Sequence, residues 1–185
     1  MSSIASAPSG SSLVAGFAAS PADDDGGTVR QYLRFALGRE MQAVRIDVVR
    51  EILEVGHMTP LPLMPAFVRG VMNLRGVVVP VIDLGARLGL GASTLGPRSC
   101  VVLVDVHADD EDARRLPMGV LVDAVHEVFD ATDDDAEPVP RLGTRVPSQF
   151  IRSIVRTREL ALAELDLDVV LEPAALRDLI ARHVQ

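Results

Sequence analysis

Tryptophan is absent from the 185-residue chain, and aromatic residues of all kinds make up only 3% of it. The core must therefore be built from aliphatic side chains, which an apolar content of 48% supplies in quantity. The single cysteine, Cys100, excludes a disulfide framework and a thiolate metal site. Because Cys100 begins an apolar run, it is predicted to be a buried core thiol.

Positive charge is also in short supply. Basic residues number 18 against 26 acidic ones, which gives a net charge of −8 and argues against both a basic nucleic-acid-binding face and a polybasic membrane anchor. No apolar run approaches the roughly 18 to 20 residues that span a bilayer, and the N-terminus lacks the pattern of a secretory signal. We expect a cytoplasmic protein with no nucleic-acid partner and no direct membrane insertion.

Catalytic and cofactor motifs are missing as well. The histidines, His57, His107, His126 and His183, are scattered without metal-ligand spacing. The acidic run 133–135 lacks the glycine and the ligand spacing of a calcium loop, so it is interpreted as a solvated loop. The sequence predicts no catalytic residues, no cofactor, no metal and no enzyme activity. A small β-barrel enzyme with a Ser/Asp/His site is the alternative, and no spacing supports it.

Composition divides the chain into three parts. Residues 1–28 are small, polar and rich in Gly, Ser and Ala, which predicts a disordered tail. Residues 29–171 form a β-rich body, and residues 172–185 form a terminal helix with Pro173 in its first turn. The helix is predicted to present one apolar face, made of Leu176, Leu179, Ile180 and Val184.

Within the body, hydrophobic alternation predicts strands separated by irregular segments. Residues 43–55 alternate at first and then lose the pattern, so a strand is favoured and a helical turn is possible. Residues 118–129 are predicted as one strand or as two with a bulge. The remaining expected strands are 32–37, 77–84, 101–106 and 150–154, and loops are expected at 59–65, 89–97 and 108–115.

The body carries an internal echo. Residues 43–55 match 119–131 at an offset of 76, and residues 67–84 match 150–167 at an offset of 83. The second pair of segments shares Phe67/Phe150, Arg69/Arg152, Arg75/Arg158, Asp83/Asp166 and Leu84/Leu167. Chance similarity between amphipathic strands is the alternative. The shared order of the matches favours two related β-units, each too small for a large core of its own, that pack together.

One stretch, 70–84, has features that its echo lacks. The tetrapeptide Asn73–Gly76 (NLRG) interrupts an apolar run, and Pro80 lies inside an otherwise regular strand. The second copy has Thr157, Arg158 and Glu159 in place of Leu74, Arg75 and Gly76, and Ala163 in place of Pro80. Because Pro80 has no N–H, its strand is predicted to lie at a sheet edge, or to turn that position away from a partner. We predict that the turn displays Arg75 for recognition, with an ordinary surface arginine as the alternative.

These residues also carry a family resemblance. The segment GVMNLRGVVVPVIDL (70–84) resembles the signature of the CheW-like chemotaxis coupling proteins. Further segments match in order: QYLRFALG (31–38), VREI (49–52), PAFVRG (65–70) and GVLVDAVHEV (119–128). The resemblance covers roughly residues 30–171. It implies a mainly β fold of two SH3-like barrels packed side by side, with no enzyme activity and no cofactor.

The resemblance also implies partners. CheW-like proteins connect the cytoplasmic tips of methyl-accepting chemoreceptors to the regulatory domain of a CheA-type histidine kinase, in arrays under the inner membrane. Carried over by position, Arg75 is the receptor-coupling arginine and Glu51 lies near it. The other implied contact and loop residues are Val49, Gly70, Asn73, Leu74, Gly76, Val79 and Pro80. The alternative is a detached regulatory module of a chemotaxis kinase or of a CheW-receiver fusion, acting in a pilus- or surface-sensing pathway.

Overall fold

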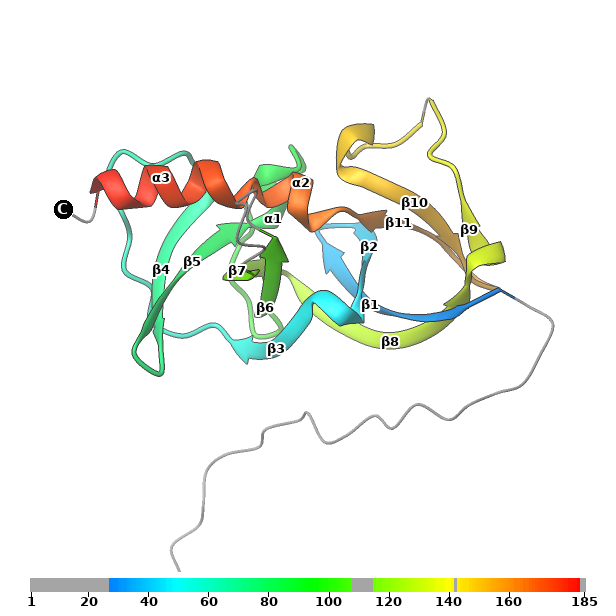
Figure 1. The fold of residues 1–185 in the computed structure, drawn as a ribbon, viewed down its shortest axis with the longest axis horizontal. Helices are drawn as coiled ribbons and strands as arrows, with labels where there is room; N and C mark the ends of the chain where they lie inside the picture. Colours follow the sequence, from blue (N-terminus) through cyan, green and yellow to red (C-terminus); the bar gives the residue numbers. More distant parts are fainter. Residues whose placement is uncertain (1–26, 108–114, 142, 184–185) are drawn as a thin grey trace, which may run out of the picture.

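The computed structural model describes residues 27–107, 115–141 and 143–183. They form two curved β-sheets that lie side by side as two small barrels (Figure 1). Barrel A contains, in spatial order, β8 (Ala124–Thr132), β1 (Val29–Leu37), β2 (Glu40–Arg45), β11 (Ala161–Leu165), β10 (Ile151–Arg156) and β9 (Ala136–Glu137). Barrel B contains β3 (Val49–Glu54), β6 (Cys100–His107), β7 (Arg115–Val122), β5 (Val77–Asp83) and β4 (Val68–Leu74). The mainly β, two-barrel prediction is confirmed.

Short helices punctuate the strands. The 3₁₀ turns are η1 (Ile46–Val48), η2 (Asp133–Asp135) and η3 (Ser148–Phe150), and the α-helices are α1 (Leu84–Arg87), α2 (Leu167–Leu171) and α3 (Pro173–His183). The stretch 43–55, for which a strand was favoured and a helical turn was possible, contains the end of β2, the turn η1 and the strand β3. Both the strand and the helical turn are therefore present. Residues 118–129 fall into two strands that part at Asp123.

The internal echo corresponds to a structural repeat. The hairpin β4–β5 followed by α1 has its counterpart in the hairpin β10–β11 followed by α2. Asp83 caps α1 by accepting from the backbone N–H of Ala86, and Asp166 caps α2 in the same way from Val169. The backbone N–H of Asp83 donates to Phe67 at 2.7 Å, and that of Asp166 donates to Phe150 at 2.9 Å. Such matched local bonding is not expected from chance similarity between strands.

The two repeats exchange strands. β11 of the second repeat pairs in parallel with β2, where Glu164 faces Ala43. At the equivalent place β5 pairs in parallel with β7, where Val81 faces Gly119. Each barrel therefore takes strands from both halves of the chain, and the two sequence units are not the two barrels.

The largest hydrophobic cluster lies between the barrels and is built almost entirely from aliphatic residues, as predicted. Its fully buried members come from both sheets and from helices α1 and α2, and include Leu33, Phe35, Ile82, Leu84, Val104, Val106, Val170 and Leu171. Arg87 sits where the repeats meet. Its guanidinium lies 5.0 Å from the ring centre of Phe67 and 5.1 Å from that of Phe150, and its Nε donates to the backbone carbonyl of Val170. At these distances a guanidinium is attracted to the faces of aromatic rings.

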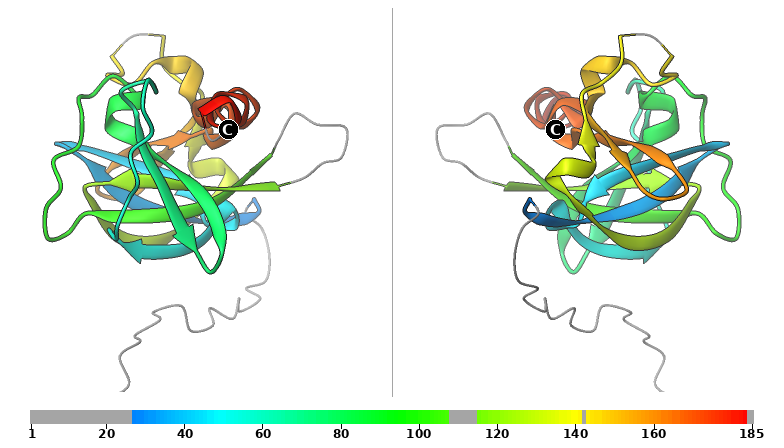
Figure 2. Two further views of the ribbon diagram at one scale, coloured as in Figure 1. Left: turned by 90° about the vertical axis from the view of Figure 1, so that its left-hand side faces the viewer. Right: turned by 90° about the vertical axis from the view of Figure 1, so that its right-hand side faces the viewer.

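Helix α3 begins at Pro173, as predicted, and runs along barrel B, where Figure 2 shows it nearly end-on. Leu176 is buried, whereas the other predicted apolar-face residues lie outside the described side chains. None of the helices formed by the described residues has the length and apolar character needed to cross a membrane. Cys100 is half-buried against the core rather than fully buried. Residues 1–26 of the predicted tail and residues 108–114 of the predicted loop lie outside the described residues.

Candidate functional site

The tip of the β4–β5 hairpin is a two-residue turn. Leu74 and Val77 close it, and Arg75 and Gly76 form it with φ values of 52° and 87°. Two successive positive φ values are typical of the type I′ turn that fits the twist of a hairpin. The Asn73 side-chain oxygen accepts from the backbone N–H of Gly76 at 2.9 Å. The predicted turn is therefore real, and Asn73 and Gly76 shape it.

Arg75 extends from this tip into solvent, with 85% of its side chain exposed. Its Nη2 lies 3.3 Å from Oε1 of Glu51, which is 26% exposed on β3. A bulge in β3 precedes this glutamate, because Val49 faces Val104 while Glu51 faces Leu103 and leaves Arg50 as the extra residue. Bulges re-aim the side chains beside them. The structure thus places Glu51 next to Arg75, as the family resemblance implied.

A groove of about 450 Å³ lies between β3 and the hairpin. Its apolar lining residues are Leu53, Leu74, Val77, Val79, Leu103 and Pro117. Its charged rim consists of Arg50, Glu51 and Arg75. Val77 and its neighbour Val78 are 53% and 58% exposed, so apolar surface is available beside the arginine. An apolar centre with a charged rim is the usual anatomy of a protein interface.

Three predicted contact residues have structural roles in the fold. Val79 is only 2% exposed and forms part of the groove floor, so its side chain offers a partner almost no surface. Gly70 is buried with φ +142°, and a Cβ there would lie 2.3 Å from the carbonyl oxygen of Thr59. Val49 is half-buried and packs against the main core. The fold requires Gly70 to be glycine, which the sequence alone could not distinguish from a role in binding.

Pro80 does not mark an edge strand, because β5 lies between β7 and β4. The second predicted alternative holds. Pro80 faces Val71 three pairs from the closing pair of the hairpin, and alternation makes this a non-hydrogen-bonded pair with respect to β4. The parallel ladder with β7 begins only at Val81. The missing N–H of Pro80 therefore costs neither ladder a hydrogen bond.

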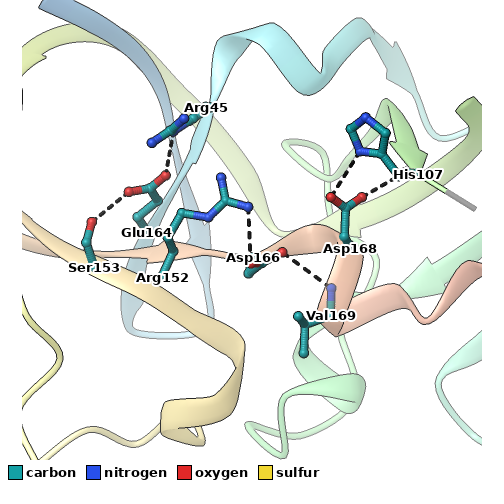
Figure 3. Close-up of polar contacts among 8 residues, drawn as sticks. All are labelled: Arg45, His107, Arg152, Ser153, Glu164, Asp166, Asp168 and Val169. Atoms are coloured by element: carbon teal, nitrogen blue, oxygen red, sulfur yellow. Dashed lines mark hydrogen bonds and ion pairs between the residues drawn. The ribbon is translucent and has the colours of Figure 1, made fainter. Parts of the chain in front are cut away.

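Sequence reasoning missed a buried polar cluster in barrel A. Glu164 is 2% exposed, accepts from Nε of Arg45 at 2.8 Å and accepts from the Ser153 hydroxyl at 2.6 Å (Figure 3). Burial raises the pKa of the Tyr32 phenol, and the nearby Glu164 carboxylate raises it further. Glu164 shares its strand face with the buried Leu162, so alternation could have flagged it. Figure 3 also shows Arg152 paired with Asp166, and His107 paired with Asp168.

Comparison with known proteins identifies the family. The model of the CheW-like domain matches residues 31–174. The chain belongs to the CheW-like family. A probable chemotaxis protein CheW of Rhizobium etli is 36% identical over 139 residues, which cover 74% of this chain and 85% of the relative. The chemotaxis protein CheW of Treponema pallidum is 29% identical over 149 residues, covering 80% of this chain and 86% of the relative.

A solved structure agrees. The crystal structure of the scaffolding protein TtCheW from Thermoanaerobacter tengcongensis superposes with a TM-score of 0.70 at 29% identity, covering 78% of this chain and 94% of that one. This CheW-like chain is thus a coupling adaptor of chemotaxis signalling, as the resemblance implied. Among the described residues no group of three or more His, Cys, Asp or Glu side chains could hold a metal ion.

Proposed function

We propose that this adaptor joins the cytoplasmic tips of methyl-accepting chemoreceptors to the regulatory domain of a CheA-type histidine kinase, in arrays under the inner membrane, without catalysis of its own. The single observation that carries the proposal is Arg75, which stands 85% exposed at the tip of a fixed turn. Its neighbour Glu51 holds one edge of the guanidinium, while its remaining donors face solvent. Carboxylates and backbone carbonyls of a receptor helix are suitable acceptors.

The ion pair positions the arginine rather than stabilising the fold. An exposed pair of this kind contributes about 0–1 kcal/mol, and Arg75 is largely exposed. The turn contributes more to binding, because a two-residue hairpin fixed by Asn73 limits the freedom that Arg75 would lose on contact. Leu74 and Val77 supply the apolar contact area beside it. Charge then sets register and partner choice.

The test is calorimetric titration of the full chain with a soluble receptor-tip fragment and, separately, with the kinase regulatory domain. Arg75→Glu is expected to weaken receptor binding about tenfold or more, which corresponds to about 1.4 kcal/mol, and to leave kinase binding near the wild-type value. Arg145→Glu is the matched control, since Arg145 is also exposed, at 72%, and paired with a glutamate, Glu40. Wild-type receptor affinity in Arg75→Glu, or a wild-type chain that binds neither partner, would overturn the proposal.

A further inference from the structure

One side chain, Arg87, connects the two hairpin–helix units of the repeat, β4–β5 with α1 and β10–β11 with α2. Arg87 is the last residue of α1. Its guanidinium lies over the rings of Phe67 and Phe150, which are equivalent positions of the sequence echo. Its Nε donates to the carbonyl of Val170 at 2.6 Å, and its Nη2 lies 3.4 Å from Oε1 of Glu172. The guanidinium therefore contacts one residue of the first repeat and three that lie in or directly after the second.

The two phenylalanines hold the bases of the hairpins. The backbone carbonyl of Phe67 accepts from the N–H of Asp83, which ends β5 and caps α1. The carbonyl of Phe150 accepts from the N–H of Asp166 in the same way. Since Phe67 directly precedes β4, the guanidinium contacts the base of the hairpin whose tip carries Arg75.

Ion pairs within the repeats occur in both copies, whereas Arg87 occurs in one. Nη1 of Arg69 lies 3.9 Å from Oδ2 of Asp83, and the equivalent arginine and aspartate of the second repeat lie 3.1 Å apart. At the same offset of 83, the counterpart of Arg87 is Val170, which is fully buried. An aliphatic side chain thus fills this position in the second repeat. The guanidinium belongs to the first repeat alone and reaches across to that valine.

Stability alone does not account for an arginine at this place. The Arg87 side chain is 19% exposed, so the cation has lost most of its contact with water. Its partner Glu172 is 61% exposed, which makes the ion pair weak. Apolar side chains of similar volume are often as stabilising as a buried charge with its partner. A guanidinium adds direction, because its donors are fixed in one plane and its hydrogen bond to Val170 has a preferred geometry.

The partner of Arg87 also has an unfavourable backbone conformation. Glu172 is the C-cap of α2, and Pro173 after it begins α3. Its φ of 40° and ψ of 61° are left-handed, a conformation that glycine adopts at lower cost. A glycine here would have no carboxylate for Arg87. Strained residues of this kind cluster at functional positions. Two locally unfavourable features, a desolvated cation and a left-handed glutamate, therefore meet in one contact.

We propose that Arg87 is a positioning residue of the adaptor, which fixes the orientation of the second hairpin–helix unit relative to the first, and so of barrel A relative to barrel B. The core between the barrels supplies stability, but apolar contacts are non-directional and define a unique arrangement less strictly. In a coupling adaptor, a displacement at one barrel reaches the other through rigid contacts between them. The inference does not depend on which residues bind which partner.

The test measures barrel orientation in the full, isotope-labelled chain by residual dipolar couplings of the backbone amides. Arg87→Met removes the guanidinium and keeps a long side chain, whereas Arg87→Lys keeps the charge without the planar group. Arg34→Met is the matched control. Arg34 is 21% exposed and pairs with a glutamate, Glu127, within barrel A alone.

In the wild type, the couplings of both barrels should fit one rigid arrangement. In Arg87→Met, we expect the alignment of the two barrels to differ by about a fifth or more in strength, or by about ten degrees or more in direction. Arg87→Lys should resemble Arg87→Met, and Arg34→Met should resemble the wild type. Within each barrel the couplings should still fit that barrel's own structure, which a general loss of the fold would not permit.

Wild-type orientation in Arg87→Met would overturn the proposal. Wild-type orientation in Arg87→Lys would assign the effect to charge and contradict the role of the guanidinium, and an equal change in Arg34→Met would show a general effect of removing a partly buried cation. Glu172→Gly is the second variant, because glycine suits this backbone and the protein should fold even if Arg87→Met does not. It should change the orientation in the same sense by a smaller amount. An unfolded Arg87→Met together with wild-type orientation in Glu172→Gly would leave Arg87 a purely structural role and overturn the proposal.

Discussion

The Arg75 guanidinium lies 3.3 Å from the Glu51 carboxylate across the mouth of the barrel B groove. The two residues come from different strands, β3 and the β4–β5 turn, so their contact depends on the closure of the barrel. The Glu51 side chain is 26% exposed and the Arg75 side chain is 85% exposed. The carboxylate is therefore held by its surroundings in the fold, whereas the guanidinium is accessible to a partner. Stability and binding should therefore respond differently to changes at this pair.

Neutralising the pair should leave the fold intact. Arg75→Ala and Glu51→Gln are each expected to change the free energy of unfolding by less than about 1 kcal/mol. In receptor binding, Arg75→Ala should be the more damaging change, and Glu51→Gln should cause an intermediate loss because the guanidinium remains but loses its orientation. Urea unfolding followed by circular dichroism measures the first effect, and calorimetry measures the second. A loss of several kcal/mol in stability would assign the pair a structural role.

Gly70 should tolerate no side chain. A Cβ at this position would lie 2.3 Å from the Thr59 carbonyl oxygen, and its φ of +142° is accessible essentially only to glycine. We expect Gly70→Ala to lower the free energy of unfolding by about 3 kcal/mol or more. Gly38→Ala is the control, since Gly38 also has a positive φ, +60°, but no atom within 4 Å of its added Cβ. The control should cost about 1 kcal/mol, and equal losses in the two variants would contradict the steric explanation.

The buried Glu164 should be replaceable only together with Arg45. At the corresponding places barrel B has Val81 and Leu121, both fully buried. Glu164→Val alone leaves Arg45 without its carboxylate and should cost about 2–3 kcal/mol, a modest loss for a buried pair because Arg45 is 27% exposed and can reach water. The double variant Arg45→Leu, Glu164→Val should return to within about 1 kcal/mol of the wild type. Additive losses in urea unfolding would show that the two side chains do not act as a pair.

Tyr32 should make the fold sensitive to alkali. Burial raises the folded-state pKa of its phenol above the ordinary value of 10.0, so the unfolded chain releases this proton first as the pH rises. The contribution of Tyr32 to stability is complete below about pH 10 and is lost as the pH passes through the folded-state pKa. Unfolding measured from about pH 9 to about pH 11 should show a decline that is shallower in Tyr32→Phe. Parallel curves for the two proteins would place the sensitivity elsewhere.

Local requirements made much of the fold and the site predictable. Gly76 suits a turn that needs positive φ between two alternating strands, and the Asp83 and Asp166 caps recur at the same offset as their hairpins. The mixed pattern of residues 43–55 predicted both a strand and a helical turn, because each follows from neighbours along the chain. The contact of Glu51 with Arg75 joins residues that are 24 positions apart, so it was implied by the family resemblance and not by a local pattern.

Features set by distant pairing were not predictable in this way. Pro80 is compatible with an interior strand because it occupies a non-hydrogen-bonded pair opposite β4 and because the ladder with β7 begins one residue later, at Val81. The inward direction of Val79 and the close approach of Thr59 to Gly70 depend on which strands meet in space. The pairing of Glu127 with Arg34 depends on the register between β1 and β8. The hydrophobic pattern of a single strand does not specify which other strand it pairs with or in which register.

The exchange of strands between repeats has a consequence for how the protein is made. Barrel A begins with β1 and β2 near the start of the chain and is completed by β11, near its end. A ribosome adding about 5–20 residues per second would leave the first hairpin waiting on the order of ten seconds for its parallel partner. Barrel B, by contrast, is built from the consecutive strands β3 to β7, so all its strands are synthesised before those that complete barrel A. A prematurely terminated chain therefore lacks the strands that close barrel A, and a nascent β1–β2 hairpin is the segment that a chaperone would have to shield.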